Sequence, residues 1–142
     1  MKKGEDYIGV TVSFFCHDGE GNYVFQKRSI RCRDEHERWD CGGGGLEFGD
    51  TIEDTLRKEI REEYGAEVLS FEFLGVRDAH REHEGKKTHW VSLDHKVLLD
   101  RASVINAEPH KFDEIAWVRL DALPEPLHSM LPDALERYRD RL

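Results

Sequence analysis

Cysteine is scarce in this chain. The 142 residues include only Cys16, Cys32 and Cys41, and no two of them form a CxxC pair. An odd count without that motif argues against a disulfide framework and against a cysteine zinc site. Reduced thiols in a cytoplasmic protein are the simplest interpretation.

Positive charge and long apolar runs are also in short supply. Lys and Arg number 21 against 30 Asp and Glu, which gives a formal net charge of −9. A nucleic acid polymer is bound through a basic surface, so this balance argues against DNA or RNA as a partner. A small nucleotide held through a metal ion stays compatible with it. No apolar run is long enough to span a bilayer, and we expect no membrane partner.

Linkers, internal repeats and low-complexity segments are absent too. The chain is 38% hydrophobic and 36% charged, and its length suits one domain, which we place over residues 1–142. Alternation and turn residues predict strands at 7–16, 23–30, 67–82, 88–100 and 114–120, with helices at 51–64 and 130–141. This order predicts an α+β or mixed α/β fold with helices packed on a sheet, and a loop at 83–87 between the two long strands.

Each predicted helix has recognisable end signals. Asp50 and Thr51 are both suitable N-caps for the first helix, and Gly65 is suited to end it. An apolar stripe of Ile52, Leu56 and Ile60 marks its buried face. For the last helix, Ser129 is the expected cap, with inward positions at Leu131, Ala134, Leu135 and Tyr138.

Three glutamates share one face of the first helix. Glu59, Glu62 and Glu63 are spaced i, i+3 and i+4, and Glu59 and Glu63 fall at the edge of the apolar stripe rather than opposite it. Carboxylates beside a core are costly unless a cation compensates them, and Mg²⁺ or Mn²⁺ prefers oxygen ligands. The alternative is an ordinary solvated acidic face.

Four consecutive glycines, Gly42 to Gly45, precede this helix. Without a Cβ, such a backbone approaches a phosphate or a metal closely, although flexible turns also use glycine runs. The run is not a P-loop, because no Lys–Ser/Thr pair follows it.

The glycines and the acidic helix together resemble the Nudix box, over residues 44–66, "GGLEFGDTIEDTLRKEIREEYGA". The pattern of that box is Gly, five residues, Glu, seven residues, then Arg-Glu-aliphatic-x-Glu-Glu-x-Gly-aliphatic. Gly44 begins the pattern and Gly65 closes it, with Asp50 replacing the first Glu and Lys58 replacing the Arg. "FQKRS" (25–29) and "EIAWV" (114–118) are similar to segments that flank the box. The resemblance implies an α/β/α sandwich, with a mixed sheet, a central box helix and a C-terminal helix.

The resemblance also implies a function. Family members hydrolyse a nucleoside diphosphate linked to another moiety, with Mg²⁺ or Mn²⁺ as cofactor. Carried over, Glu59, Glu62 and Glu63 are the expected metal ligands, joined by a carbonyl of Gly43 or Gly44. Glu59 and Glu63 are catalytic candidates, and Glu59 or Glu114 is expected to act as the general base.

Substrate contacts are expected from Arg28, Lys58 and the backbone of Gly43 and Gly44. A surface charge is the alternative for Arg28, and Trp117 is expected in the core rather than under a base. His80, His83, His89 and His95 lack zinc spacing, and we expect exposed or hydrogen-bonded side chains. The alternative is that residues 80–89 and 109–112 line a substrate pocket.

Downstream marks help to choose among substrates. ADP-ribose hydrolases of the family often have a proline about fifteen residues after the box, but this chain has none between Ala66 and Pro109. Diadenosine polyphosphate enzymes often have a tyrosine slightly later, and no tyrosine occurs in the 80s of this chain. A nucleoside triphosphate or related nucleotide is therefore favoured, with ADP-ribose or another nucleoside-diphosphate derivative as an alternative. A non-catalytic nucleotide sensor is the other alternative, and it conflicts with the complete set of helix glutamates. Dimers are common in the family, so a homodimer is compatible with the resemblance.

Overall fold

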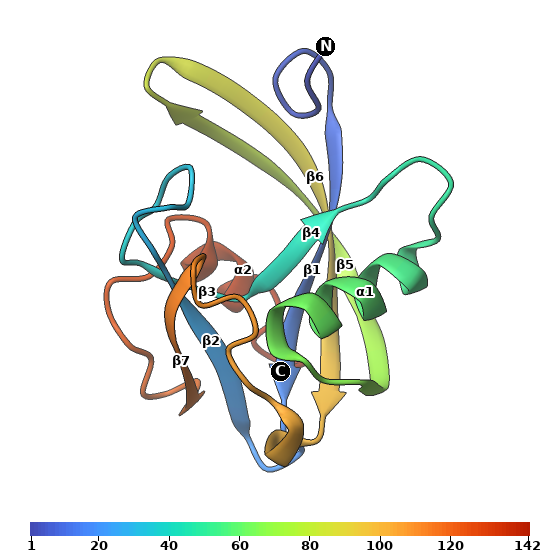
Figure 1. Cartoon of the computed structure of the whole chain (residues 1–142), viewed down its shortest axis with the longest axis vertical. Helices are drawn as coiled ribbons and strands as arrows, with labels where there is room; N and C mark the ends of the chain where they lie inside the picture. Colours follow the sequence, from blue (N-terminus) through green and yellow to red (C-terminus); the bar gives the residue numbers. More distant parts are fainter.

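The order of elements agrees with the sequence prediction. A computed structural model of the protein describes all of residues 1–142 (Figure 1). The strands are β1 (Gly9–His17), β2 (Asn22–Arg28), β3 (Trp39–Asp40), β4 (Gly42–Gly45), β5 (Val68–His83), β6 (Lys86–Leu99) and β7 (Phe112–Arg119). The helices are α1 (Ile52–Tyr64) and α2 (Leu131–Arg137), with a short 3₁₀ turn at Arg101–Ser103. Neither α-helix has the length and apolar character needed to cross a membrane.

All seven strands belong to one mixed sheet. Its main order is β3-β2-β1-β6-β5, with β4 paired to β1 and β7 paired to β2. Strands β1 and β6 run parallel in a register that joins Gly9 to Trp90 and His17 to Leu98, whereas the other pairs are antiparallel. The mixed sheet predicted from the sequence is confirmed.

The second edge of β1 is divided between two partners. Strand β2 pairs with it only at Cys16 and His17, while β4 pairs along Thr11 to Phe14. The chain therefore crosses from β2, where β3 is attached, to β1, where β4 lies, at Cys41. Strands β1 and β2 diverge beyond their short ladder, and the glycine strand runs between them.

Successive residues of β1 point to opposite faces of the sheet, as the pleat requires. Val12, Phe14 and Cys16 join a core with Leu56 and Ile60 of α1. On the other face, Phe15 packs in a second core that includes Leu131 of α2 and Tyr138, which directly follows this helix. The sheet thus lies between the two helices, which confirms the predicted α/β/α sandwich (Figure 1).

Helix α1 has the end signals that the sequence predicts. Thr51, rather than Asp50, is the N-cap, and its side chain accepts a hydrogen bond from the Asp54 amide at 3.0 Å. Gly65 ends the helix in the left-handed region, with φ at 65°. One expectation is wrong: Ile52 is 43% exposed, because contact with the core begins one turn later, at Thr55 and Leu56.

Three other local expectations need correction. Helix α2 ends at Arg137 rather than at residue 141, and Met130, not Ser129, is the N-cap, without a side-chain capping bond. The predicted loop at 83–87 is only a tight turn at Glu84 and Gly85, which have φ values of 52° and 79°. The glycine run is a strand, β4, rather than a flexible turn.

Candidate functional site

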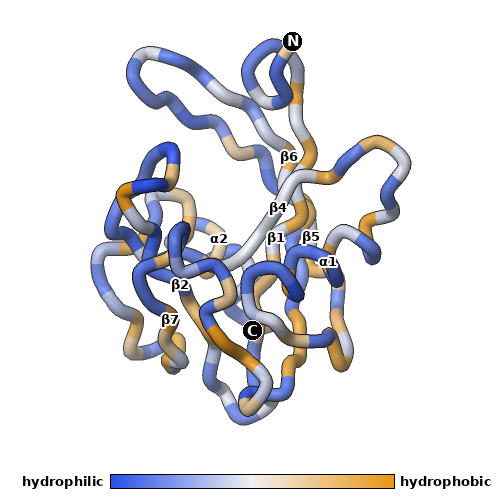
Figure 2. The backbone as a smooth tube through the Cα atoms, in the orientation of Figure 1, coloured by the Kyte–Doolittle hydropathy of each residue, from blue (hydrophilic) through white to orange (hydrophobic).

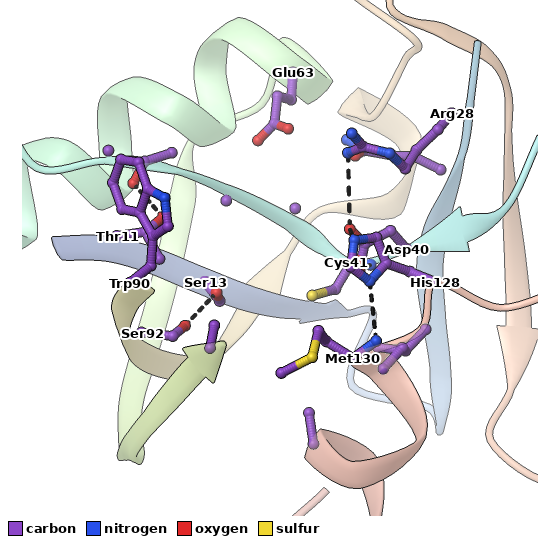
Figure 3. Close-up of a pocket in the computed structure, with 18 of the residues that line it drawn as sticks. Thr11, Ser13, Arg28, Asp40, Cys41, Glu63, Trp90, Ser92, His128 and Met130 are labelled. Atoms are coloured by element: carbon purple, nitrogen blue, oxygen red, sulfur yellow. Dashed lines mark hydrogen bonds and ion pairs between the residues drawn. The ribbon is translucent and has the colours of Figure 1, made fainter. Parts of the chain in front are cut away.

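A cleft of about 300 Å³ opens where β1 and β2 diverge (Figure 3). This volume falls at the lower end of the range for small-molecule sites, roughly 300–1,000 Å³. Its walls come from β1, β2, β4, the β5–β6 hairpin and α2, and α1 contributes one side chain. The polar residues among those that line it are Thr11, Ser13, Gln26, Arg28, Asp40, Glu63, Arg77, Arg81, Ser92, Lys111 and His128.

The contribution of α1 is the carboxyl group of Glu63. This residue is only 3% exposed, and its Oε2 atom has no hydrogen-bond partner. In Figure 3 it projects from the helix into the same space that Arg28 bounds from the other side. Burial raises the pKa of Glu63 well above its usual range, and the nearby charge of Glu59 adds to the rise. Gln26, fully buried and facing the same cleft, also has no hydrogen-bond partner for its amide nitrogen or oxygen.

Glu59 lies directly on the backbone of β4. A Cβ added to Gly44 would come within 2.2 Å of the Glu59 carboxyl carbon, so only glycine leaves room for this side chain. Glu59 is half-buried, and burial, followed by repulsion from Glu62, raises the pKa of its carboxyl group. The carbonyl oxygen of Gly44 accepts a hydrogen bond from Thr11 Oγ1 at 2.9 Å, which helps to fix the orientation of this peptide.

Glu59 is not among the residues that line the cleft, and three other expected site residues also lie outside the lining. Glu62 is exposed on α1, on the same helical face as Glu59 and Glu63. Lys58 is also exposed, and its Nζ lies 4.0 Å from Asp50 Oδ2, so the two departures from the box pattern face each other. Glu114 is exposed in β7, where it lies opposite Lys27 in the strand register, and it is not among the residues that line the cleft.

A wall of cations faces the acidic helix across the cleft. Arg28, Arg77, Arg81 and Lys111 all line it. Arg28 donates through Nε to the Asp34 carbonyl at 3.1 Å and through Nη2 to Asp34 Oδ1 at 3.3 Å, and Arg81 also pairs with Asp34. These pairs hold two guanidinium groups at the cleft, and they show Arg28 as more than a charge on a strand edge.

Comparison with known proteins agrees with this geometry. A model of the NUDIX domain matches residues 8–139. The chain belongs to the NUDIX family. It is 51% identical over 95 residues to "Nucleoside triphosphatase NudI" of Escherichia coli O17:K52:H18, and 32% identical over 93 residues to the protein of that name from Enterobacter sp. (strain 638). Each match covers 61% of this chain and 64% of the relative, so the alignment spans less than two thirds of these curated relatives.

Solved structures support the fold. The crystal structure of a MutT NUDIX hydrolase from Burkholderia pseudomallei has a TM-score of 0.81 at 25% identity, and the similarity covers 93% of this chain and 98% of that one. A MutT protein from Methanosarcina mazei has a TM-score of 0.75 at 19% identity, covering 99% of this chain and 96% of that one. The second likeness bears on the fold alone.

Some residues of this Nudix cleft escaped the sequence prediction, whereas Arg81 and Lys111 lie in segments that it named only as an alternative. Arg77, Ala79 and Arg81 alternate along β5 and line the cleft together, and this spacing of two was a readable signal. Gln26 was readable as the polar residue in the apolar strand "YVFQ". The contribution of Lys111 depends on how β7 packs against β2, which the sequence does not show.

The alternative proposed for the second hairpin is correct in part. Arg81, Lys111 and Phe112 line the cleft, but His80 and His89 do not. Trp117 is partly buried against the core on the α1 side, with the Arg101 guanidinium 5.1 Å from its ring centroid, in agreement with the expected core position.

Proposed function

We propose that this protein is a Mg²⁺- or Mn²⁺-dependent pyrophosphohydrolase that cleaves a diphosphate linkage in a nucleoside triphosphate or a related nucleotide. The observation that carries the proposal is the buried carboxyl group of Glu63, whose Oε2 atom has no hydrogen-bond partner, in a cleft that is also lined by three arginines and a lysine. An acidic helix and a cationic wall, separated by a cleft, suit a ligand that is itself anionic and is bound together with a cation.

The residues present fit a divalent metal ion. Burying a carboxyl oxygen without a partner is costly, and an ion that takes oxygen ligands removes this cost. Glu59, Glu62 and Glu63 would hold the ion, joined by a backbone carbonyl of Gly43 or Gly44. When bound, such an ion polarises a phosphoryl oxygen and lowers the pKa of a water molecule.

The side chains of the protein have separate tasks in this proposal. Arg28 would bind a phosphate oxygen, since its guanidinium faces the cleft and is already oriented by Asp34. The backbone of Gly43 and Gly44 would let the diphosphate approach closely. Glu59 would accept the proton of the attacking water, since burial raises the pKa of its carboxyl group and makes it a stronger base than an exposed glutamate. The exposed position of Glu114 gives no support for that role.

A nucleoside triphosphate is the favoured substrate. The two curated relatives carry the name nucleoside triphosphatase, although each alignment covers only part of them. The missing downstream marks of the ADP-ribose and diadenosine subgroups point the same way. The complete set of glutamates on α1 favours an active hydrolase over a non-catalytic nucleotide sensor.

A substrate panel tests the proposal. The purified protein is incubated with Mg²⁺ and with nucleoside triphosphates, deoxynucleoside triphosphates, oxidised nucleotides, nucleoside-diphosphate sugars and dinucleotides, and the products are identified. We expect turnover of a triphosphate to a monophosphate and pyrophosphate, abolished by EDTA. If the protein turns over none of these compounds, the proposal is contradicted. If it turns over only ADP-ribose, that compound replaces the nucleoside triphosphate as the proposed substrate.

The carboxylates are tested with a matched pair of variants. Glu63→Gln should lower kcat by about 10²-fold or more, within the range expected when a group that acts on the reacting atoms is lost. Glu53→Gln, on the same helix but paired only with Arg57 at 3.9 Å, should leave kcat unchanged. Equal effects of the two substitutions would show that the helix charge, rather than the site, is responsible.

A further inference from the structure

A second group of ligating side chains lies on the β5–β6 hairpin, outside the cleft. His80 and His89 are directly opposite each other in the register of this hairpin, with ring centroids 4.1 Å apart. Asp78 lies two residues before His80 on the same strand, and His89 Nε2 is 2.9 Å from Asp78 Oδ1. The three side chains therefore converge on one spot.

The group is separate from the proposed catalytic site. Alternation along β5 turns Arg77, Ala79 and Arg81 toward the cleft, so Asp78 and His80 lie on the opposite face of the hairpin. This part of the hairpin extends away from the body of the molecule and is mainly hydrophilic (Figures 1 and 2). Asp78 and His80 are exposed and His89 is partly exposed, so an ion can reach the group from solvent.

The geometry suits a metal ion. One ligand atom from each of the three side chains lies within 4.8 Å of the others, and no other group of three histidine, cysteine or acidic side chains in the molecule reaches this closeness. His83, further along the hairpin, has only Glu84 beside it, at 3.7 Å. His95 is buried, with Nδ1 3.0 Å from the Leu93 carbonyl.

The donor set determines the class of ion. Two imidazoles and one carboxylate favour a borderline transition metal such as Zn²⁺, whereas Mg²⁺ prefers oxygen ligands only. We propose that Asp78, His80 and His89 form a surface site for Zn²⁺ or a similar transition-metal ion, with the remaining coordination positions filled by water.

Such a site would join the two strands of the hairpin from its outer face. Asp78 and His80 belong to β5 and His89 to β6, so an ion bound to all three would oppose separation of the strands. A ligand that binds only the folded state stabilises it. Zn²⁺ should therefore raise the Tm of the protein through this site.

Calorimetric titration with Zn²⁺ tests the proposal, in a large excess of Mg²⁺ so that oxygen-only sites are filled. We expect the wild-type protein to bind one more Zn²⁺ than the double variant His80→Gln, His89→Gln, and to show a Zn²⁺-dependent rise in Tm that the variant lacks. The control is His83→Gln, which removes a histidine of the same hairpin and should retain both properties.

Two results would overturn the proposal: equal Zn²⁺ stoichiometry in the wild type and the double variant, or loss of the site in His83→Gln. If the double variant has a lower Tm without metal, Asp78→Asn provides the same comparison with a single exposed change. Because the readouts are metal stoichiometry and Tm, they are independent of whether the cleft hydrolyses nucleotides.

Discussion

Two of the buried carboxyl groups in this protein, those of Asp94 and Glu63, are treated in opposite ways. Asp94 is 0% exposed and is fully paired: Arg77 donates to it through Nε and Nη2 at 2.6 and 3.0 Å, and the hydroxyls of Ser92 and Tyr138 donate at 2.7 and 2.5 Å. Glu63 is 3% exposed, and one of its oxygens has no partner. A buried carboxylate with all its partners serves the fold, whereas one without them is available to a ligand.

The difference also separates the two halves of the structure. Tyr138 follows the last residue of α2, so the network around Asp94 attaches the C-terminal segment to β5 and β6. Glu63 lies on α1, and its buried oxygen without a partner lowers the stability of the fold while it leaves a carboxyl group available in the cleft. Four variants or conditions would break or sharpen this comparison.

The largest effect is expected at Asp94. Asp94→Ala leaves the Arg77 guanidinium half-buried without its partner, and breaking a buried pair in this way costs about 3–5 kcal/mol. Chemical denaturation should show a loss of this size. The exposed Asp121→Ala, which removes a partner of Arg119 at 3.5 Å, should cost less than about 1 kcal/mol. A small loss at Asp94 would mean that its network contributes little to the fold.

The opposite sign is expected at Glu63. Without a divalent metal, Glu63→Gln should stabilise the protein by about 1–3 kcal/mol, because burial disfavours the ionised form of a carboxyl group whose Oε2 atom has no partner. The measurement is denaturation in EDTA, and adding Mg²⁺ should narrow the difference by stabilising only the wild type. Destabilisation by Glu63→Gln in EDTA would show that the carboxyl group is satisfied in the fold.

The pH dependence of stability provides a related test. A glutamate in the unfolded chain titrates at about pH 4.3, and burial in the folded protein raises the pKa of Glu63 well above that value. Its contribution to stability is therefore fully present below about pH 4.3 and is lost as the pH rises through the folded pKa. In EDTA, the wild type should lose stability relative to Glu63→Gln as the pH rises. A difference that stays constant with pH would contradict this.

The smallest change in stability is expected at Gly44. Its added Cβ would meet the end of the Glu59 side chain, which is able to move aside, and alanine loses less backbone entropy than glycine on folding, so Gly44→Ala should change stability by less than about 1 kcal/mol. The displaced carboxylate should nevertheless reduce kcat markedly. Gly45→Ala is the matched control, since the nearest atom to its Cβ would be 3.8 Å away. Equal kcat values for the two variants would show that the position of Glu59 on Gly44 is not needed.

The sequence predicts the local parts of the site well. Thr51, Gly65 and the spacing of the glutamates act within one helix, so the capped helix α1 and its acidic face follow from neighbouring residues. The prediction that Ile52 is buried was wrong, because an apolar stripe on a helix does not show where the sheet beneath the helix ends. The position of Glu114 depends on the pairing of β7 with β2, and the box pattern contains no information about that.

The network around Asp94 could not have been predicted. Its members, Arg77, Ser92, Asp94 and Tyr138, come from two strands and from the segment after α2. No local pattern connects them. The end of α2 could not be predicted for the same reason. Tyr138, whose hydroxyl donates a hydrogen bond to Asp94, is no longer helical and has a φ of −109°.

The parallel pairing of β1 with β6 has a consequence for how the cleft forms. The register that joins Gly9 to Trp90 and His17 to Leu98 closes a loop of roughly 80 residues, and contacts so distant in sequence form slowly. Strand β4 and helix α1 adjoin each other in the chain and precede β5 and β6 during synthesis. The acidic half of the site is thus available to form early, whereas Arg77 and Arg81 can complete the opposite wall only after the hairpin has been made and has docked.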